Sequence, residues 1–293
     1  MSPVAAALAE RGLPPRIVLT GQHPGLDPSA FGLSEFDRIG LHCPGRADPD
    51  AHAAAVRSAL LPQLKQRPSL IAVQGDTSSA LGAAQAAFDA GIPVAHIEAG
   101  LRTFDLSAPW PEEGYRRIID ARAAMLFAPT DQAADNLNAE GVTGAVFVTG
   151  NSGVDATLAV EARLPAPAVR DSAQQRLLVT CHRRESWGDG LTGIAEAVRD
   201  LAGDWTDIRF VIHPNAHVAA TMRGLLEGIA GVTLLDPCGH GAMLQEMRGA
   251  DLVLSDSGGM QEEAPVLGVP MLVLRAKTER PEGIDAGHAL LVG

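Results

Sequence analysis

Short apolar runs alternate along the chain with alanine-rich stretches in which apolar residues recur at helical spacing. The short runs, bounded by turn-forming residues, predict buried strands, and the stretches between them predict helices. The predicted strands are 17–19, 70–73, 93–97, 124–127, 145–148, 176–180, 209–212, 232–234, 252–255 and 271–274. The predicted helices are 3–11, 51–64, 78–90, 113–123, 132–140, 190–201, 216–228 and 259–267.

This alternation is typical of an α/β fold, in which a mostly parallel sheet carries helices on each face. Residues 156–175 break the pattern, because they contain Leu-Pro-Ala-Pro and several charges but no strand signal. We interpret them as a helix and a linker between two α/β units. The expected domains are therefore residues 1–165 and residues 166–293.

The composition is that of a globular protein, since 46% of the 293 residues are hydrophobic and 20% are charged. This length predicts about two domains. The apolar runs are strand-length, well short of the roughly 20 residues of a membrane span. The first residues, Met-Ser-Pro, show no basic segment followed by an apolar core, so no secretory signal is visible. We expect a cytoplasmic protein.

The net charge of −12 argues against a nucleic acid or an anionic membrane as partner. An anionic small ligand would need a local cluster of arginines and helix N-termini. Cys43, Cys181 and Cys238 lie far apart and form no Cys-x-x-Cys pair, which indicates buried free thiols in a reducing compartment.

Two carboxylates directly follow neighbouring predicted strands. Asp76 lies in Gly-Asp-Thr after strand 70–73, and Glu98 ends strand 93–97 in His-x-Glu-Ala-Gly. Carboxylates at neighbouring strand ends could share a site and shift each other's pKa. The structural alternatives are a plain N-cap for Asp76 and an ion pair with Arg102 for Glu98.

A third acidic position begins a predicted helix. Pro111 suits the first helical turn, where Glu112 and Glu113 complement the helix dipole. That explanation is complete in itself, yet a Trp-Pro pair followed by two acids is more than a helix start requires. Glu112 is therefore a candidate functional residue.

The second half of the chain carries candidate anion-binding groups. His182 and Arg183 belong to a His-Arg-Arg cluster after strand 176–180, for which a solvated basic loop is the alternative. After strand 252–255, the run Ser257, Gly258 and Gly259 precedes a helix, so that backbone N–H groups can approach a phosphate. A simple turn with a helix cap is the alternative there. Glu263 could accept ribose hydroxyls.

One histidine pair has a spacing seen in zinc sites. His213 and His217 flank a proline directly after a predicted strand, and no third ligand is obvious. No metal is expected.

Six motifs occur together and in order. They are Gly-Asp-Thr (75–77), His-x-Glu-Ala-Gly-Leu-Arg-Thr (96–103), Pro-Trp-Pro-Glu-Glu (109–113), His-Arg-Arg-Glu (182–185), Asp-Ser-Gly-Gly-x-Gln-Glu-Glu-Ala-Pro (256–265) and Thr-Glu-Arg-Pro-Glu (278–282). In this combination the chain resembles the UDP-N-acetylglucosamine 2-epimerases of the non-hydrolysing bacterial type.

The resemblance implies a glycosyltransferase-B-like architecture, with two Rossmann-like domains facing a cleft, commonly in a homodimer. It implies reversible C2 epimerisation of UDP-GlcNAc to UDP-ManNAc by elimination and re-addition of UDP through 2-acetamidoglucal. No hydride is transferred, so no cofactor is expected. The expected partners are UDP-GlcNAc, UDP-ManNAc and UDP.

The resemblance also assigns residues. It implies acid/base roles for Asp76, Glu98 and Glu112, and it places His182 near the diphosphate. The implied substrate-binding residues are Arg183, His213, Ser257, Gly258, Gly259, Glu263 and Arg280. The loop 237–243 occupies the stretch expected near uracil, although its sequence departs from the family.

Both ends of the chain depart from the family pattern. The family begins with a strand and a Gly-Thr-Arg-Pro-Glu-like loop, and it continues with helices beyond the equivalent of Gly293. We therefore expect a fold truncated at both ends. Two alternative functions stay open: a hydrolysing epimerase that releases ManNAc and UDP, and a UDP-sugar-binding remnant with little turnover.

Overall fold

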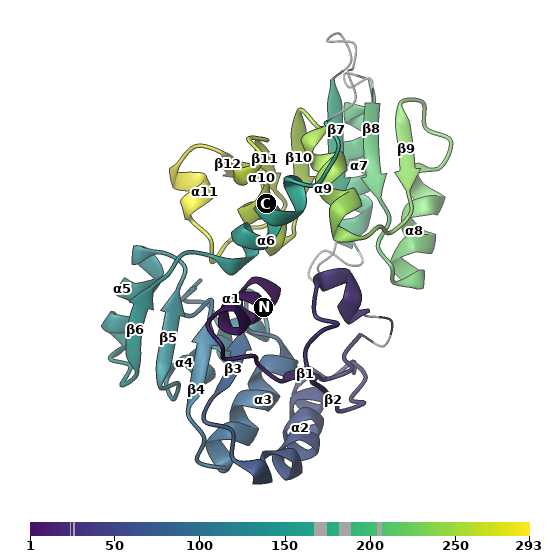
Figure 1. Cartoon of the computed structure of the whole chain (residues 1–293). Coiled ribbons are helices and arrows are strands. Elements are labelled where there is room, and N and C mark those ends of the chain that lie inside the picture. Colours follow the sequence, from purple (N-terminus) through teal and green to yellow (C-terminus); the bar gives the residue numbers. More distant parts are fainter. Residues whose placement is uncertain (24, 26, 167–174, 182–188, 204–206) are drawn as a thin grey trace. The chain divides into compact units, whose positions relative to one another are not determined.

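The computed structural model of the chain contains two compact units, Met1–Ser152 and Gly153–Gly293. It describes the whole chain except residues 24, 26, 167–174, 182–188 and 204–206. Strands and helices alternate within each unit (Figure 1). The domain boundary expected between residues 165 and 166 stays a prediction.

The first unit contains two parallel sheets. Its strands are β1 (Ile17–Leu19), β2 (Arg38–Gly40), β3 (Ile71–Gln74), β4 (Val94–Ile97), β5 (Met125–Ala128) and β6 (Ala145–Val148). Its helices are α1 (Ser2–Glu10), α2 (Pro49–Leu60), α3 (Ser78–Asp89), α4 (Glu112–Asp120) and α5 (Asp131–Glu140), with 3₁₀ turns η1 (Pro28–Phe31) and η2 (Leu61–Gln66). β1 pairs with β2, and a separate sheet has the order β3-β4-β5-β6.

The second unit contains one six-stranded parallel sheet of order β12-β11-β10-β7-β8-β9. Its strands are β7 (Arg176–Thr180), β8 (Asp207–Val211), β9 (Val232–Leu235), β10 (Leu252–Ser255), β11 (Met271–Val273) and β12 (Ala289–Leu291). Its helices are α6 (Ser152–Glu161), α7 (Asp189–Leu201), α8 (Ala216–Leu226), α9 (His240–Arg248), α10 (Gly258–Val266) and α11 (Glu282–Asp285).

The strand orders identify both units as Rossmann-like. A doubly wound Rossmann sheet has the order 3-2-1-4-5-6, and the second unit reproduces it from β9 through β7 to β12. In the first unit, the pairs β2-β1 and β3-β4-β5-β6 correspond to the two sides of that order. The described part of this unit shows no strand at the central position. The predicted α/β class with parallel sheets is confirmed.

Every predicted strand and helix is present, with ends shifted by a few residues. Among the elements outside the predicted ranges are β2 and α9. β2 escaped notice because it is short and carries only one apolar residue, Ile39, between exposed neighbours. Residues 237–243 were expected to form a loop, whereas α9 begins at His240, and Leu244 and Met247 bury one face of this helix at i, i+3 spacing.

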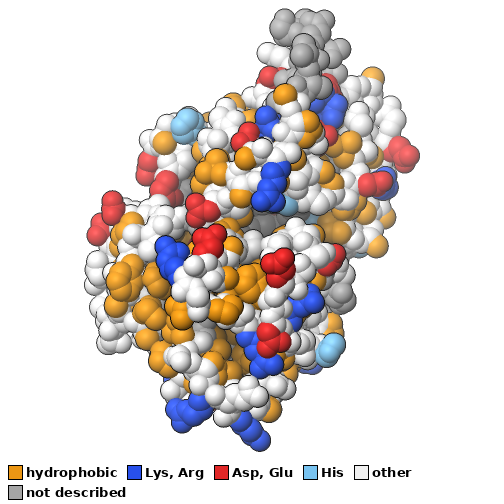
Figure 2. All heavy atoms as spheres, in the orientation of Figure 1, with side chains coloured by type: hydrophobic (Ala, Val, Ile, Leu, Met, Phe, Trp, Pro, Cys, Tyr) orange, Lys and Arg blue, Asp and Glu red, His pale blue; other side chains and the backbone are white. Residues whose placement is uncertain are grey.

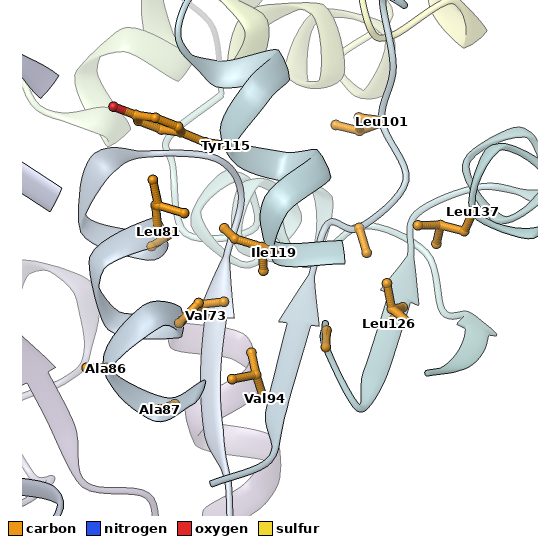
Figure 3. Close-up of a cluster of buried hydrophobic side chains, with 14 of the residues drawn as sticks. Val73, Leu81, Ala86, Ala87, Val94, Leu101, Tyr115, Ile119, Leu126 and Leu137 are labelled. Carbon is orange, nitrogen blue, oxygen red and sulfur yellow. The ribbon is translucent and has the colours of Figure 1, made fainter. Parts of the chain in front are cut away.

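The core of the larger sheet in the first unit is closed by α3 and α4. Leu81 of α3 and Ile119 of α4 point towards Val73 of β3, as Figure 3 shows. Many of the other core residues on α3 are alanines, which let the helix lie close to its neighbours. The turns at the carboxyl ends of β3 and β4 therefore stand on a tightly packed base.

The sheet of the second unit is buried on both faces. Leu177 and Val179 of β7 belong to one hydrophobic cluster, while Leu178 between them belongs to another. Side chains of a strand alternate between faces, so each cluster lies on its own side of the sheet. This is the burial expected of a parallel sheet with helices on both faces.

Part of the first unit's surface is apolar. Figure 2 shows hydrophobic side chains gathered over the region of β5 and β6. Phe147 and Val148 of β6 are 45% and 51% exposed.

None of the helices in the described part of the chain combines the length and apolar character needed to cross a bilayer.

The three cysteines are free thiols. Cys43 and Cys181 are buried as expected, whereas Cys238 is exposed, so the expectation of burial is wrong for this residue. Cys238 lies before α9, in the segment whose helix was not predicted.

The contact between α2 and α3 depends on a missing side chain. A Cβ on Gly82 would lie 2.4 Å from the carbonyl oxygen of Ala53. Gly82→Ala should therefore lower the free energy of unfolding by about 1–3 kcal/mol through overpacking. Gly114→Ala in α4, where a Cβ would meet nothing within 4 Å, should instead raise it by about 0.5–1 kcal/mol. Urea denaturation of both variants measures the two effects, and equal effects would contradict the packing argument.

Candidate functional site

The turns after β3 and β4 bring Asp76 and Glu98 to the same edge of the sheet. The two strands are paired in parallel from Ile71 and Val94 onwards. The backbone N–H of Gly75 donates to the carbonyl oxygen of Ile97 at 3.0 Å and joins the turns. The side chain of Gln74 donates to Oε2 of Glu98 at 3.4 Å. The expectation that these two acids occupy neighbouring strand ends thus agrees with the strand pairing.

Glu98 has a left-handed backbone, with φ of 68°. For a residue with a Cβ, such a conformation costs on the order of 1–3 kcal/mol and persists only where the surroundings enforce it. Here the flanking groups are bound, because the Ile97 carbonyl accepts from Gly75 and the Ala99 N–H donates to Phe127. Backbone strain enforced in this way is common at active sites.

Asp76 forms an ion pair with Arg116, which lies on α4. Nε of Arg116 donates to Oδ2 of Asp76 at 3.0 Å, and Nη2 also binds this oxygen. Nη1 of Arg116 donates to Glu113 at 3.1 Å. Glu113 is fully buried and accepts from the backbone N–H groups of Thr103 and Phe104. Arg116 therefore ties the carboxylate on β3's turn to α4.

Glu112, the third predicted acid, is the first residue of α4 and is partly buried. Its neighbour Glu113 is the one that binds the loop 103–104 and Arg116. The two adjacent glutamates thus lie in different environments, with Glu113 in a structural network. This division leaves Glu112 as the acid/base candidate of the pair.

A chain of charges, buried except at its end, lies beneath the two turns. Nδ1 of His96 is 2.5 Å from Oδ1 of Asp120, and Nε2 of His96 is 2.9 Å from the Gly75 carbonyl oxygen. Asp120 also binds the N–H of Gly100 at 3.2 Å and Nη2 of Arg102 at 2.8 Å. Arg102 binds Glu140 as well, at 2.6 Å. Arg102, the predicted alternative partner of Glu98, therefore belongs to this chain of charges.

The pair His96–Asp120 holds opposite charges. Burial alone would lower the pKa of His96, but the hydrogen bond and charge of Asp120, with the Gly75 carbonyl, raise it above its usual value. Burial alone would raise the pKa of Asp120, but His96 and Arg102 lower it below its usual value. Both shifts favour an imidazolium bound to a carboxylate.

In the second unit, the predicted phosphate-binding turn lies at the N-terminus of α10. Ser257 caps this helix by accepting from the N–H of Met260, and its own N–H donates to Ser255 at 3.0 Å. Gly258 and Gly259 form the first helical turn, where the N–H groups have no acceptor within the helix. A Cβ on Gly259 would meet only the Ser257 hydroxyl, at 4.0 Å. The turn is thus open on this side.

Glu263, the predicted ribose-binding acid, is one turn further along α10. Its Oε1 is 2.9 Å from Nε2 of His240, the first residue of α9. This hydrogen bond is the main reason that the pKa of His240 is raised, since partial burial opposes it. The segment 237–243 therefore contacts the candidate nucleotide site through His240.

Arg280 also lies against α10. Its Nε donates to Glu262 at 2.6 Å, and its Nη1 binds Glu279. The Thr278 hydroxyl donates to Gln261 at 2.6 Å and accepts from the Arg280 N–H. The segment after β11 is thereby held along the helix, with Arg280 beside the acids of its first turns.

Other predicted residues are less well defined. His213 follows β8 and accepts from the Asn215 N–H at 3.0 Å. His182 and Arg183 lie outside the described residues. Among the residues that the structure describes, no group of three His, Cys, Asp or Glu side chains is placed to hold a metal ion.

Comparison with known proteins places this arrangement in a family. Residues 6–293 match the family model described as UDP-N-acetylglucosamine 2-epimerase. The chain belongs to this family of isomerases. Throughout its length it is also 38% identical to the UDP-N-acetylglucosamine 2-epimerase of Yersinia pestis, covering 83% of that protein.

Solved structures of 2-epimerases have the same fold. The enzyme from Neisseria meningitidis, bound to UDP-GlcNAc, superposes with a TM-score of 0.92 at 34% identity, over all of this chain and 84% of that one. The enzyme from Methanocaldococcus jannaschii, in complex with UDP-GlcNAc and UDP, gives 0.86 at 32% identity, again over all of this chain and 84% of that one. The predicted family is confirmed.

The sequence analysis gave no role to four residues that bind the candidate site: Arg116, His96, Asp120 and His240. The first three are buried, and each forms an ion pair. The position of His96 inside the apolar strand 93–97, and of Arg116 on the inner face of a helix, could have indicated such pairs, because buried polar groups need partners. His240 gave no such signal.

Arg116 should be essential for stability. Its guanidinium is almost fully buried between Asp76 and Glu113. Arg116→Met would leave these carboxylates without their cation, and we expect a loss of about 3–5 kcal/mol in the free energy of unfolding. Arg117→Met is the matched control, since Arg117 is 45% exposed and its Nε lies 3.5 Å from Oε1 of Glu140. It should change stability by less than about 0.5 kcal/mol. Chemical denaturation compares them, and similar losses would contradict this reading.

Proposed function

We propose that this chain interconverts UDP-GlcNAc and UDP-ManNAc without hydrolysing the sugar–nucleotide bond. Membership of the 2-epimerase family supports this, as does the similarity to structures bound to UDP-GlcNAc. The observation that carries the proposal is the pairing of β3 and β4, which places Asp76 and Glu98 in joined turns at one sheet edge.

The reaction divides into an elimination and an addition. A base removes the proton from C2 of the sugar, the C1–O bond breaks, and UDP leaves with the bonding electrons to give 2-acetamidoglucal. A proton is then delivered to the opposite face of C2, and UDP adds again at C1. No electrons are gained or lost overall, so the chemistry needs acids and bases rather than a hydride carrier.

The first unit supplies the acid/base groups of this proposal. Glu98 is held in a strained turn, Asp76 is bound to a guanidinium, and Glu112 begins α4. Carboxylates in such different surroundings can differ in proton affinity, which a reaction needing both a base and an acid requires. We assign proton transfer to this set.

The second unit supplies the UDP-binding groups. The N-terminus of α10 offers two glycine N–H groups and a positive helix dipole to the diphosphate. Glu263 on the same helix accepts the ribose hydroxyls, and Arg280 lies nearby to favour negative charge. His182 and Arg183 follow β7, which pairs with β10, and His213 follows β8, the next strand of the sheet. We assign all three to the same ligand.

Glu98→Gln should abolish epimerisation and leave UDP binding nearly unchanged. The amide has the shape of the carboxylate but accepts no proton, so kcat should fall by about 10²- to 10⁴-fold. Conversion of UDP-GlcNAc to UDP-ManNAc and exchange of the C2 hydrogen in D₂O measure the loss, and calorimetry measures the UDP affinity.

Glu10→Gln, an exposed change at the end of α1, is the control and should leave turnover unaltered. Equal losses of UDP affinity and turnover in Glu98→Gln would argue against its role as proton acceptor. Release of free ManNAc and UDP by the wild type would indicate the hydrolysing alternative.

Gly259→Val should weaken UDP binding by about 10- to 100-fold, which corresponds to one lost charge-assisted hydrogen bond. Because the position is exposed and open, the fold should survive while the isopropyl group blocks the approach of phosphate. Gly224→Val on α8, also in open surroundings, is the matched control. Calorimetry with UDP distinguishes them, and unchanged affinity in folded Gly259→Val would remove the phosphate role of this turn.

The resemblance also predicts a homodimer, which stays a prediction for this chain. Sedimentation velocity measures it directly.

A further inference from the structure

We propose that the buried pair His96–Asp120 is a positioning device that fixes the turns of Asp76 and Glu98 relative to each other. This inference rests on the proposed acid/base role of those two carboxylates. His96 and Asp120 themselves touch no substrate in this proposal, because both are fully buried.

The two bonds of His96 define its charge. The Gly75 carbonyl oxygen, 2.9 Å from Nε2, can only accept a hydrogen bond. The carboxylate of Asp120, 2.5 Å from Nδ1, is likewise an acceptor when ionised. Both ring nitrogens must then carry hydrogens, so the ring is an imidazolium.

The groups around His96 agree with this charge. Asp120 and, at longer range, Asp76 raise the pKa of His96, and the Gly75 carbonyl adds to their effect. On the far side of Asp120, buried Arg102 and exposed Glu140 form a second ion pair, so the charges along this chain alternate in sign. The imidazolium is thereby stabilised within the core of the unit.

Three hydrogen bonds link the catalytic turns. His96 donates to the carbonyl of Gly75, which directly precedes Asp76. Gly75 donates to Ile97, which directly precedes Glu98. Asp120 accepts from the N–H of Gly100, two residues after Glu98, and thus reaches the second turn from below. The pair His96–Asp120 is therefore bonded to both turns.

The turns need such bonds because their backbone is unusual. Gly75, Glu98 and Gly100 all have positive φ, at 65°, 68° and 88°. In Glu98 this conformation is strained, because the residue has a Cβ. If His96 released Gly75, the carboxylates could shift by a fraction of a residue length, and a shift of about 1 Å can lower turnover about 100-fold.

Two substitutions separate the bonds of His96. Asparagine places its amide near Nδ1, so His96→Asn can keep the bond to Asp120 and lose the bond to Gly75. Glutamine places its amide near Nε2, so His96→Gln can keep the bond to Gly75. We expect kcat to fall about 100-fold in His96→Asn and to recover largely in His96→Gln, with UDP affinity unchanged in both.

Gly82→Ala is the stability-matched control. It weakens the same unit through the contact of α3 with α2, away from the His96 bonds. Its folded fraction should retain the wild-type kcat. A His96→Asn variant with wild-type kcat per folded molecule, or a Gly82→Ala variant with an equal loss, would reduce the role of His96 to packing and overturn the proposal.

The pH dependence gives a second readout. The folded-state pKa of His96 is raised. The hydrogen bond that the imidazolium donates to the Gly75 carbonyl is therefore fully formed below the usual histidine pKa of about 6.5. This bond is lost as the pH rises through the raised pKa. The wild-type kcat should therefore fall on that alkaline limb, and His96→Gln should lack the fall. An identical limb in both would overturn the assignment.

Two measurements do not need turnover. Imidazole ¹⁵N shifts should show both ring nitrogens of His96 protonated below a pH of about 6.5, and a neutral tautomer there would overturn the proposal. Hydrogen exchange at the N–H groups of Gly75 and Gly100 should accelerate in His96→Asn more than in Gly82→Ala. If the wild type shows no epimerisation, the proposed function fails, whereas these two measurements still decide whether His96 holds the turns.

Discussion

The hydrogen-bonded ion pair between His96 and Asp120 is the interaction on which the first unit's site depends. An isolated charge in this core would be strongly unfavourable, so each member requires the other. Asp120 comes from the end of α4 and His96 from β4, which means that the pair joins helix to sheet. Its outward bonds to Gly75 and Gly100 reach the turns that carry the acids. Removing one member would thus disturb packing and site together.

Helix α4 links the other parts of the same site. Glu112 stands at its first position, Arg116 binds Asp76 from its middle, and Asp120 ends it. Ile119 lies on the same inward side, one turn after Arg116, and packs into the core below β3. The buried face of the helix therefore combines an apolar contact with paired charges. The docking of this helix therefore places Glu112 and the guanidinium that binds Asp76.

The second unit reaches its proposed task by simpler means. A complete Rossmann sheet places the N-terminus of α10 directly after the central strand β10. Ser257 closes the cap, and the following glycines leave the N–H groups accessible. The bonds of Gln261 and Glu262 to Thr278 and Arg280 hold the next segment along the helix. In the proposed function, nucleotide recognition here depends on backbone geometry, whereas acid/base chemistry in the first unit depends on buried charges.

The sequence by itself determined the α/β class, the strands, the family and the candidate acids, because these depend on local spacing and on contiguous motifs such as His-x-Glu-Ala-Gly. Only the tertiary structure decided that Arg116 binds Asp76, that Arg102 binds Asp120, and that His240 binds Glu263. The partners in these pairs are separated by 40, 18 and 23 residues along the chain. A side chain's choice among several oppositely charged partners depends on which segments the packing of strands and helices brings together, and local sequence carries no record of that distance.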